Sequence, residues 1–206
     1  MQFPRTNRRR VIARPVIFLN LEMTTQFEEK SSKHIFRLLY VVRNAASYRS
    51  LKKYKDGFNQ NYWILVFNNF YDAAVLEWCK VFGTDNEPTH WKTLVDDHTS
   101  FRKGLLARIG IGEHGWESYW KQVRDYRNNL ITHHQKTPKV TQYPPLDNAL
   151  EAAFFYYEWL VKKLDELGII QEPENLKDYY FSCLEQSMRF SERAFKATKE
   201  IEEKVF

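Results

Sequence analysis

The apolar residues of this chain recur mainly at steps of three and four, the spacing that places side chains on one face of an α-helix. Between residues 61 and 82 the apolar positions form one wide stripe: Trp63, Val66, Phe67, Phe70, Ala74, Trp78 and Val81. Between residues 146 and 168 a second stripe consists of Leu146, Leu150, Ala153, Phe154, Tyr157, Val161 and Leu164. Both stripes predict long amphipathic helices that bury one face in a core.

Four further helices are expected from the same kind of pattern. They cover residues 31–48, 90–110, 116–134 and 175–206. Thr89, which follows Pro88, is the expected start of the helix at 90–110. No run of alternating apolar and polar residues is long enough to predict a strand. The sequence therefore predicts an all-α fold, an up-and-down helical bundle with an additional C-terminal helix from about residue 174.

The N-terminal segment differs from the rest of the chain in its charge. The formal net charge is +5, and five arginines without any acidic residue before Glu22 account for all of it. These are Arg5, Arg8, Arg9, Arg10 and Arg14. We therefore divide the chain into a basic, poorly ordered extension at 1–22 and a single helical domain at 23–206. The extension could also contact nucleic acid, act as an organelle presequence, or lie upstream of a natural start near Met23.

Composition narrows the class of protein further. Aromatic residues make up 16% of the chain and glycine and proline number only seven each, which favours a folded, helix-rich protein over disorder. The two cysteines, Cys79 and Cys183, indicate no disulfide framework, and a reducing cytoplasm is the default location. No apolar run approaches the roughly 18 residues of a membrane-spanning helix, so no membrane partner is expected.

Several common chemistries lack their sequence signatures. The chain has no glycine-rich phosphate loop, no dinucleotide fingerprint and no nucleophile elbow. Cys79 and His90 lie eleven positions apart, but no second pair completes a zinc site. Asp96, Asp97 and His98 form a dense polar group that is typical of a solvated helix face. We therefore expect no metal and no cofactor.

The stretch "YRNNLITHH" at residues 126–134 holds the strongest candidate for chemistry. It lies in a locally positive segment, since residues 99–139 contain eight basic and three acidic side chains. At 100° per residue, His134 lies only about 20° around an ideal helix from Arg127, whereas His133 lies about 120° away. A purely structural interpretation remains open, in which the histidine interacts with the carbonyl end of the helix dipole and the arginine pairs with a carboxylate.

The same stretch resembles the R-x(4–6)-H signature of the HEPN superfamily. These helical bundles include many prokaryotic RNases of toxin–antitoxin and abortive-infection systems. Arg127 is followed by Asn128, and five residues separate Arg127 from His133. Residues 23–168 are also similar in layout to the AbiU2-like branch, with an aromatic helix ending in "EWCKVFG" and a "THWK" helix before the motif. The residue before His133 is Thr132, where this branch often has a small apolar residue.

The resemblance implies a metal-independent endoribonuclease that uses the ribose 2′-hydroxyl of RNA as the nucleophile. His133 would act as acid and base, because an unperturbed imidazole exchanges protons near neutral pH. Arg127 would bind the phosphate through its forked donors, and Asn128 would orient the histidine or hold a phosphate oxygen. HEPN RNases usually pair so that two motifs face one cleft, which implies a homodimer with a composite site. An antitoxin protein is a further partner implied by the resemblance.

Four neighbouring residues are candidates for contact with RNA. His134 is a substrate contact or a stand-in for the catalytic histidine, and Lys121, Arg124 and Tyr126 could touch the RNA backbone or bases. Each of the last three also has a structural interpretation: Tyr126 as a core residue, the other two as exposed charges.

Other interpretations of the chain remain open. Asp72 and Glu77 are the carboxylates that could pair with Arg127. A catalytically silent module that binds RNA, a nucleotide or a partner protein is the main alternative to the RNase. A plain helical interaction protein, whose aromatic last helix packs on another chain, is the other.

Overall fold

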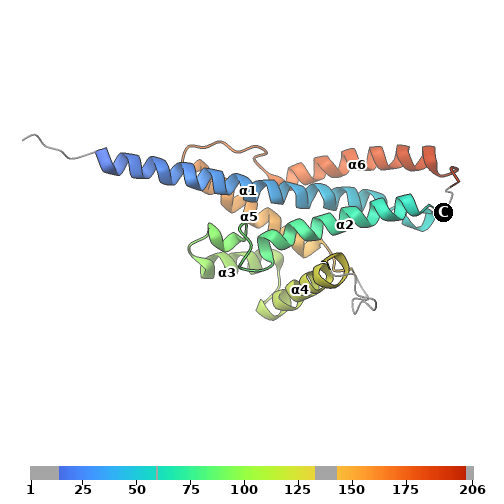
Figure 1. The fold of residues 1–206 in the computed structure, drawn as a ribbon, viewed down its shortest axis with the longest axis horizontal. Helices are drawn as coiled ribbons and strands as arrows, with labels where there is room; N and C mark the ends of the chain where they lie inside the picture. The colour runs from blue at the N-terminus through green and yellow to red at the C-terminus, as the bar shows by residue number, and fades with distance from the viewer. Residues whose placement is uncertain (1–13, 59, 133–142, 203–206) are drawn as a thin grey trace, which may run out of the picture.

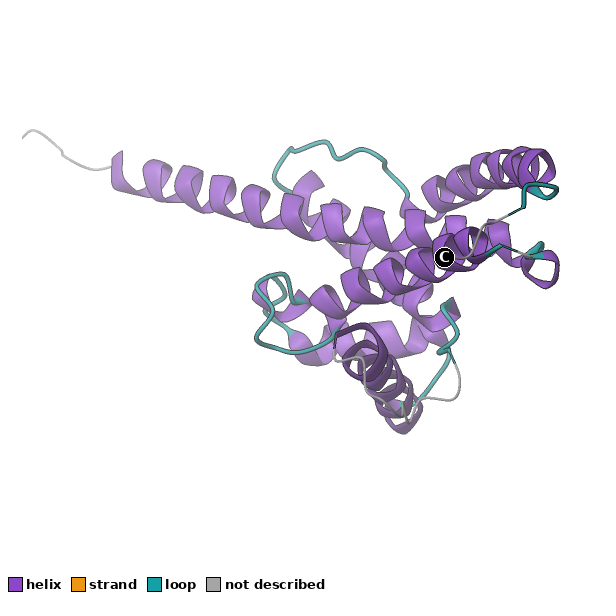
Figure 2. Cartoon of the chain, turned by 45° about the vertical axis from the view of Figure 1, so that its right-hand side comes forward, coloured by secondary structure: helices purple, strands orange, loops and turns teal. Residues whose placement is uncertain are grey.

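The computed structural model describes residues 14–58, 60–132 and 143–202, and the regular structure within these ranges is entirely helical (Figures 1 and 2). The main helices are α1 (Arg14–Lys52), α2 (Asn61–Phe82), α3 (His98–Ile109), α4 (Glu113–Tyr126), α5 (Asp147–Asp165) and α6 (Leu176–Thr198). Two short 3-10 turns, η1 (Lys55–Gly57) and η2 (Trp91–Thr93), and a π-helical turn, η3 (Arg127–Thr132), complete the set. The prediction of an all-α helical bundle is confirmed.

Helix α1 is the axis around which the other long helices are arranged. It contacts α2, α5 and α6, and its N-terminal part extends past the ends of the other helices (Figures 1 and 2). Helices α3 and α4 lie to one side, where α3 packs on α5 and α4 approaches α2. None of the described helices is long and apolar enough to cross a membrane.

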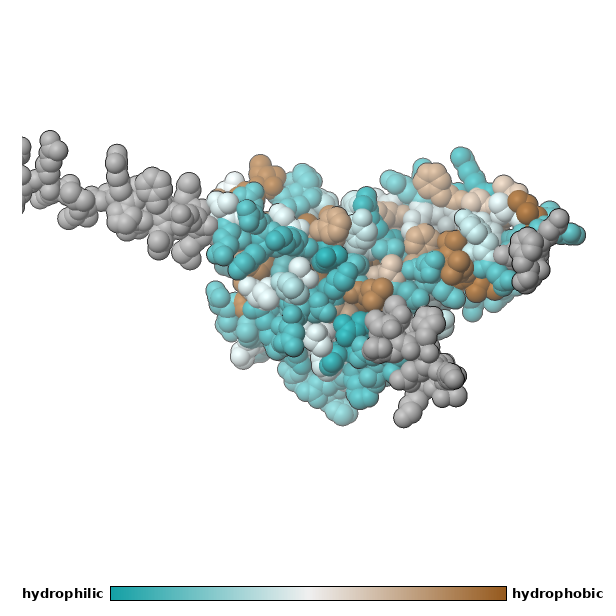
Figure 3. Space-filling model, viewed as in Figure 1, coloured by the Kyte–Doolittle hydropathy of each residue, from teal (hydrophilic) through white to brown (hydrophobic). Residues whose placement is uncertain are grey.

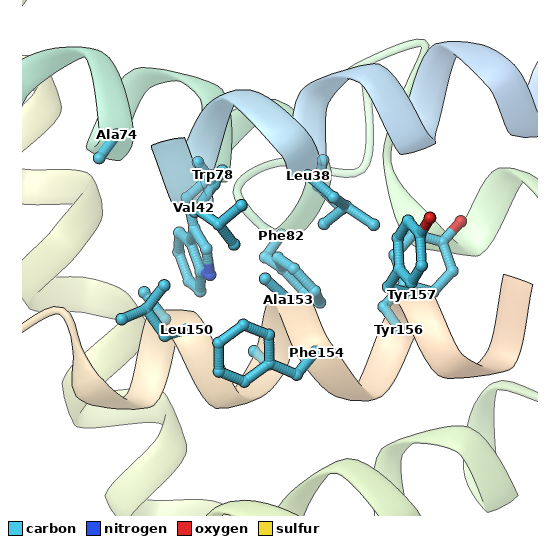
Figure 4. Close-up of a cluster of buried hydrophobic side chains, with 14 of the residues drawn as sticks. Leu38, Val42, Ala74, Trp78, Phe82, Leu150, Ala153, Phe154, Tyr156 and Tyr157 are labelled. Carbon is cyan, nitrogen blue, oxygen red and sulfur yellow. The ribbon is translucent and has the colours of Figure 1, made fainter. Parts of the chain in front are cut away.

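The core lies where α1, α2 and α5 meet. Leu38 of α1, Trp78 and Phe82 of α2, and Leu150 and Phe154 of α5 point into the same space (Figure 4). Each such buried side chain contributes on the order of 1.5–3 kcal/mol through removal of apolar surface from water. The stripe predicted for 61–82 gives a helix with the same bounds, and the stripe at 146–168 gives α5.

The surface divides into two kinds of region. On the face shown in Figure 3, the surface over α3 and α4 is mostly hydrophilic, whereas apolar side chains are more frequent toward the other end of the molecule. The exposed apolar residues of α2 and α6 include Tyr62, Leu65 and Phe190.

The predicted helix at 90–110 is wrong over its first part. Residues 90–97 form the 3-10 turn η2 and a connecting segment, and α3 begins only at His98. The reason is the side chain of Asp97, which accepts a hydrogen bond from the Ser100 amide at 3.0 Å and so caps the start of α3. Asp97 is therefore a capping residue rather than part of a helix face.

The first and last helices also differ in length from their predictions. Helix α1 begins at Arg14 instead of residue 31, so the predicted division at residue 22 falls inside it. No glycine or proline interrupts residues 16–56, which allows the helix to continue. Helix α6 ends at Thr198, and its start is capped by Asn175, whose side chain accepts from the amides of the residues that follow.

Candidate functional site

The candidate motif lies where α4 changes its helical form. Helix α4 ends at Tyr126, and the next turn, Arg127–Thr132, is π-helical. Single π-helical turns have wider hydrogen bonding than an α-helix and occur frequently at functional sites. Because the turn is wider, the ideal-helix phase that favoured His134 over His133 does not apply across this segment. Both histidines lie outside the residues that the structure describes.

Arg127 is held by neighbours on two segments. Its Nε donates to Oδ1 of Asn128 at 3.0 Å, and its Nη1 lies 3.7 Å from Oε1 of Glu87, in the loop after α2. The side chain of Arg127 is 18% exposed and that of Glu87 30%, so the pair sits at the surface with restricted access to water. The guanidinium is thus fixed in direction, with its charge partly balanced by a carboxylate.

Tyr126 fixes the position of the residue that precedes Arg127. Its ring is buried, and its hydroxyl donates to Oδ1 of Asp72 on α2 at 2.6 Å. Burial raises the pKa of Asp72, and the hydrogen bond from Tyr126 opposes that rise. Burial and the neighbouring carboxylate raise the pKa of Tyr126 well above its usual value. Tyr126 is therefore a buried residue that connects α4 to α2, which agrees with the structural interpretation given above.

Arg124 provides a second cation close to Arg127. Its guanidinium carbon lies 4.1 Å from the ring centroid of Trp120, a favourable cation–π distance. The indole Nε1 of Trp120 donates to the carbonyl oxygens of Phe82 at 2.7 Å and of Gly83 at 3.0 Å, at the end of α2. These carbonyls carry partial negative charge, which stabilises nearby cations. Arg124 is therefore half-buried and oriented, rather than a freely solvated charge.

Cys79 lies next to the two arginines but is not a nucleophile. The thiol is completely buried, and burial raises its pKa to about 12, although Arg127 and Arg124 act in the opposite direction. A thiol with such a pKa remains protonated at neutral pH and is inert. Cys183 is also free, so the two cysteines form no disulfide.

Lys121 does not join this group. Its ammonium is exposed and lies 2.6 Å from Asp125 one turn along α4, an ion pair that is screened by solvent. Glu77 was one of two carboxylates that could have paired with Arg127, but its carboxylate lies 2.9 Å from Arg37 and 2.6 Å from Lys80. The structure thus brings together Arg127, Asn128 and Arg124 among the described candidates.

A hollow of about 270 Å³ opens beside this group. Its walls include Trp91, Trp116 and Trp120, so the last of these is shared between the hollow and Arg124. Among the residues with a described placement, no cluster of three or more histidine, cysteine or acidic side chains could hold a metal ion.

Sequence reasoning missed two residues that define the site. Glu87 lies in "GTDNEP", a stretch that reads only as a turn, and nothing in it indicates a partner for Arg127. Trp120 could have been found, because Trp120 and Arg124 are four residues apart on a predicted helix and so share a face. No protein-family model, curated protein or solved structure matches this chain.

Proposed function

We propose that this protein is a metal-independent endoribonuclease in which Arg127 binds the scissile phosphate of RNA and His133 transfers the protons. The observation that carries the proposal is the fixed, partly exposed guanidinium of Arg127 beside Asn128, at a π-helical turn that ends α4 of a helical bundle. Arg124, oriented by Trp120, adds positive charge close to this position. The R-x(4–6)-H resemblance supplies the reaction type.

The proposed reaction proceeds in one displacement at phosphorus. A neutral imidazole removes the proton from the ribose 2′-hydroxyl, and the 2′-oxygen attacks the adjacent phosphorus. The bond to the 5′-oxygen breaks, that oxygen receives a proton from an imidazolium, and a 2′,3′-cyclic phosphate remains on the other fragment. Negative charge builds on the phosphate oxygens during attack, and Arg127 stabilises it through charge-assisted hydrogen bonds.

Glu87 has a defined part in this proposal. The distance of 3.7 Å between Nη1 of Arg127 and Oε1 of Glu87 exceeds that of a hydrogen bond, so this contact is electrostatic. A phosphate carries two accessible oxygens that match the arginine fork better than this contact does. Glu87 then holds the guanidinium in position until RNA replaces it.

The decisive experiment measures cleavage of single-stranded RNA by the purified protein in the presence of EDTA. We expect cleavage with 2′,3′-cyclic phosphate ends, loss of activity in Arg127→Ala and His133→Ala, and protection of RNA that carries a 2′-deoxyribose at the cleaved position. Cleavage that requires added metal, or that accepts the 2′-deoxy substrate, would overturn the mechanism. A comparison of His133→Ala with His134→Ala assigns the acid and base.

A composite site in a homodimer is part of the same proposal. Each chain contains a single copy of the motif, so a pair of chains brings a second histidine and a second arginine to one cleft. Mixing Arg127→Ala subunits with His133→Ala subunits is expected to restore cleavage, because some mixed dimers then hold one intact site. Full activity of either variant alone would contradict the composite site.

One observation favours a catalytically silent binding module instead. Arg127 already contacts Glu87 and Asn128 within the chain, as a purely structural arginine would. In that case the wild-type protein binds RNA or a partner protein, an antitoxin among the candidates, without cleaving RNA. Binding that survives in His133→Ala, together with no cleavage by the wild type, would favour this alternative.

A further inference from the structure

The hollow beside α4 shares part of its lining with a second, larger hollow along α3. The inner hollow has a volume of about 270 Å³ and the outer one about 550 Å³, and Trp91, Lys92 and Arg102 line both. The two adjacent hollows lie at the end of α2 and the start of α3 and are together called the groove. Concave sites of this size hold small ligands in many proteins.

Three tryptophan–cation pairs surround the groove. The ammonium of Lys92 lies 5.8 Å from the ring centroid of Trp91, and the guanidinium carbon of Arg102 lies 5.8 Å from that of Trp116. Arg124 on Trp120 is the third such pair, described above. Trp91 and Trp116 are almost fully buried and form rigid walls, whereas Trp120 is partly accessible. Lys92 and Arg102 are therefore each held by a tryptophan ring as well as by a carboxylate.

Charge differs between the two parts of the groove. The outer hollow is lined by three cations, Lys92, Arg102 and Lys103, and by one carboxylate, Glu113, which accepts from Arg102 at 2.8 Å. Lys103 has no carboxylate partner among the residues placed in the structure. Lys92 is paired with Asp85 and Arg102 with Glu113, so Lys103 supplies the unbalanced positive charge that favours an anionic group such as phosphate in the outer hollow.

The charges that line the inner hollow are balanced, because Lys92 and Arg102 face two carboxylates. Its lining adds the carboxylates of Asp85 and Glu117 to the tryptophan walls. Asp85 is engaged by Lys92 at 2.6 Å, whereas Glu117 has no cationic partner within the described ranges. A free carboxylate next to an aromatic surface suits a ribose hydroxyl and a planar base, the groups that carboxylates and tryptophan rings recognise in nucleotides.

We propose that this groove binds a nucleotide unit, with its phosphate on Arg102 and Lys103 in the outer hollow and its sugar and base beside Glu117 and Trp120 in the inner one. The same chemistry is present in a free nucleoside monophosphate and in a single-stranded RNA. The proposal uses none of the residues Arg127–His134, so it does not depend on the nuclease activity.

The test uses tryptophan fluorescence and calorimetry of the purified full chain. The probes are adenosine 5′-monophosphate, adenosine, inorganic phosphate and a ten-nucleotide single-stranded RNA. We expect the monophosphate to quench fluorescence and to bind at least about tenfold more tightly than adenosine, because one charge-assisted contact is worth about that factor. Equal binding of adenosine and its monophosphate, or no binding of any nucleotide probe, would overturn the proposal.

Variants distinguish binding at the groove from non-specific attraction of the monophosphate to surface charge. Arg102→Ala and Lys103→Ala are each expected to weaken binding of the monophosphate about tenfold. The matched control is Arg189→Ala on α6, which removes an exposed arginine that also pairs with a glutamate, Glu185, and should leave binding unchanged. If Arg102→Ala loses helicity by circular dichroism, Lys103→Ala alone decides, because Lys103 is exposed and packs in no core. Unchanged binding in a folded Lys103→Ala variant would contradict the proposal.

The RNA probe distinguishes the two sources of the ligand. RNA that binds more tightly than the monophosphate, and that loses affinity in Lys103→Ala, would show that the groove holds one nucleotide of a bound strand. RNA that binds no better than the monophosphate would show that the groove takes a free nucleotide. Either result supports recognition of a nucleotide unit.

Discussion

Tyr126 donates its hydroxyl to Asp72 at a distance of 2.6 Å, and this bond ties the end of α4 to the middle of α2 one residue before Arg127. The ring of Tyr126 also packs at an angle on Tyr71, with 5.1 Å between the ring centroids. Because Asp72 is partly buried, removal of the hydroxyl leaves its carboxylate with one hydrogen bond fewer in a site of limited access to water. The position of Arg127 therefore depends on the hydrogen bond between its neighbour Tyr126 and Asp72.

Tyr126→Phe is expected to lower the free energy of unfolding by about 1–3 kcal/mol, the cost of leaving a buried acceptor without its donor. Urea unfolding followed by circular dichroism measures this change. Tyr40→Phe is the control, because Tyr40 lies on an exposed part of α1 and should lose little stability. Equal losses in the two variants would contradict the role of the Tyr126–Asp72 bond.

Glu87→Gln is expected to strengthen RNA binding and to preserve cleavage, because the change removes the negative charge beside Arg127 while keeping the shape of the side chain. The effect should shrink at high salt, since the pair is partly exposed. Binding of a non-cleavable 2′-deoxy strand measured at two salt concentrations tests this. Loss of binding in Glu87→Gln would indicate that the carboxylate holds the arginine for structural reasons alone.

The bounds of a helix were predictable where a single amphipathic stripe covered the whole helix. The stripe from Trp63 to Val81 specified α2 because apolar spacing and a following glycine both act locally. The start of α3 was not predictable from periodicity: Thr89 after Pro88 was the expected start, but the Asp97 side chain caps a helix that begins at His98. At the start of α3, the position of the helix is therefore set by the capping side chain of Asp97 and not by the spacing of apolar residues.

The candidate site was predictable only in part, for a different reason. Arg127 and Asn128 are adjacent in sequence, and their contact could be inferred from the motif. The partner Glu87 lies 40 positions away in a loop, and no periodic signal connects a loop to a helix end. The π-helical turn was also unexpected, because the sequence at 127–132 fits an α-helix equally well.

Replacement of two glycines near the start of α4 by alanine should change the stability of the protein in opposite directions. Gly110 ends α3 with a φ of 77°, so Gly110→Ala is expected to cost about 1–2 kcal/mol of stability through backbone strain. Gly115 lies within α4, where an added Cβ meets only Ile111 at 3.4 Å. Gly115→Ala should therefore stabilise the protein by up to about 1 kcal/mol. Thermal unfolding of both variants tests the pair, and a shift of the same sign in both would contradict it.

A buried polar network links three segments of the bundle. Nδ1 of His34 on α1 lies 2.7 Å from the Tyr156 hydroxyl of α5, and Nε2 lies 3.3 Å from the Thr93 hydroxyl of η2. The Thr93 hydroxyl donates to the carbonyl of His90 at 2.8 Å, so it accepts from Nε2 of His34. Nδ1 then accepts from Tyr156, which defines a neutral imidazole with one donor and one acceptor. A second proton on His34 would therefore leave the buried hydroxyl hydrogen of Tyr156 without its acceptor.

Stability is expected to fall as the pH drops from about 6.5 to about 4, because burial lowers the pKa of His34 and of His90 from 6.5 to about 4. Between these pH values the unfolded chain binds more protons than the folded chain. The contribution of the neutral histidines to the free energy of unfolding is therefore complete above pH 6.5 and is lost progressively as the pH falls toward 4. For His34 the loss amounts to roughly 3 kcal/mol at most. Urea unfolding across this range should show a shallower slope in His34→Gln, whereas His114→Gln, which removes an exposed histidine, should keep the wild-type slope. Stability that stays constant between pH 6.5 and pH 4 in the wild type would show that the network tolerates the charged imidazole.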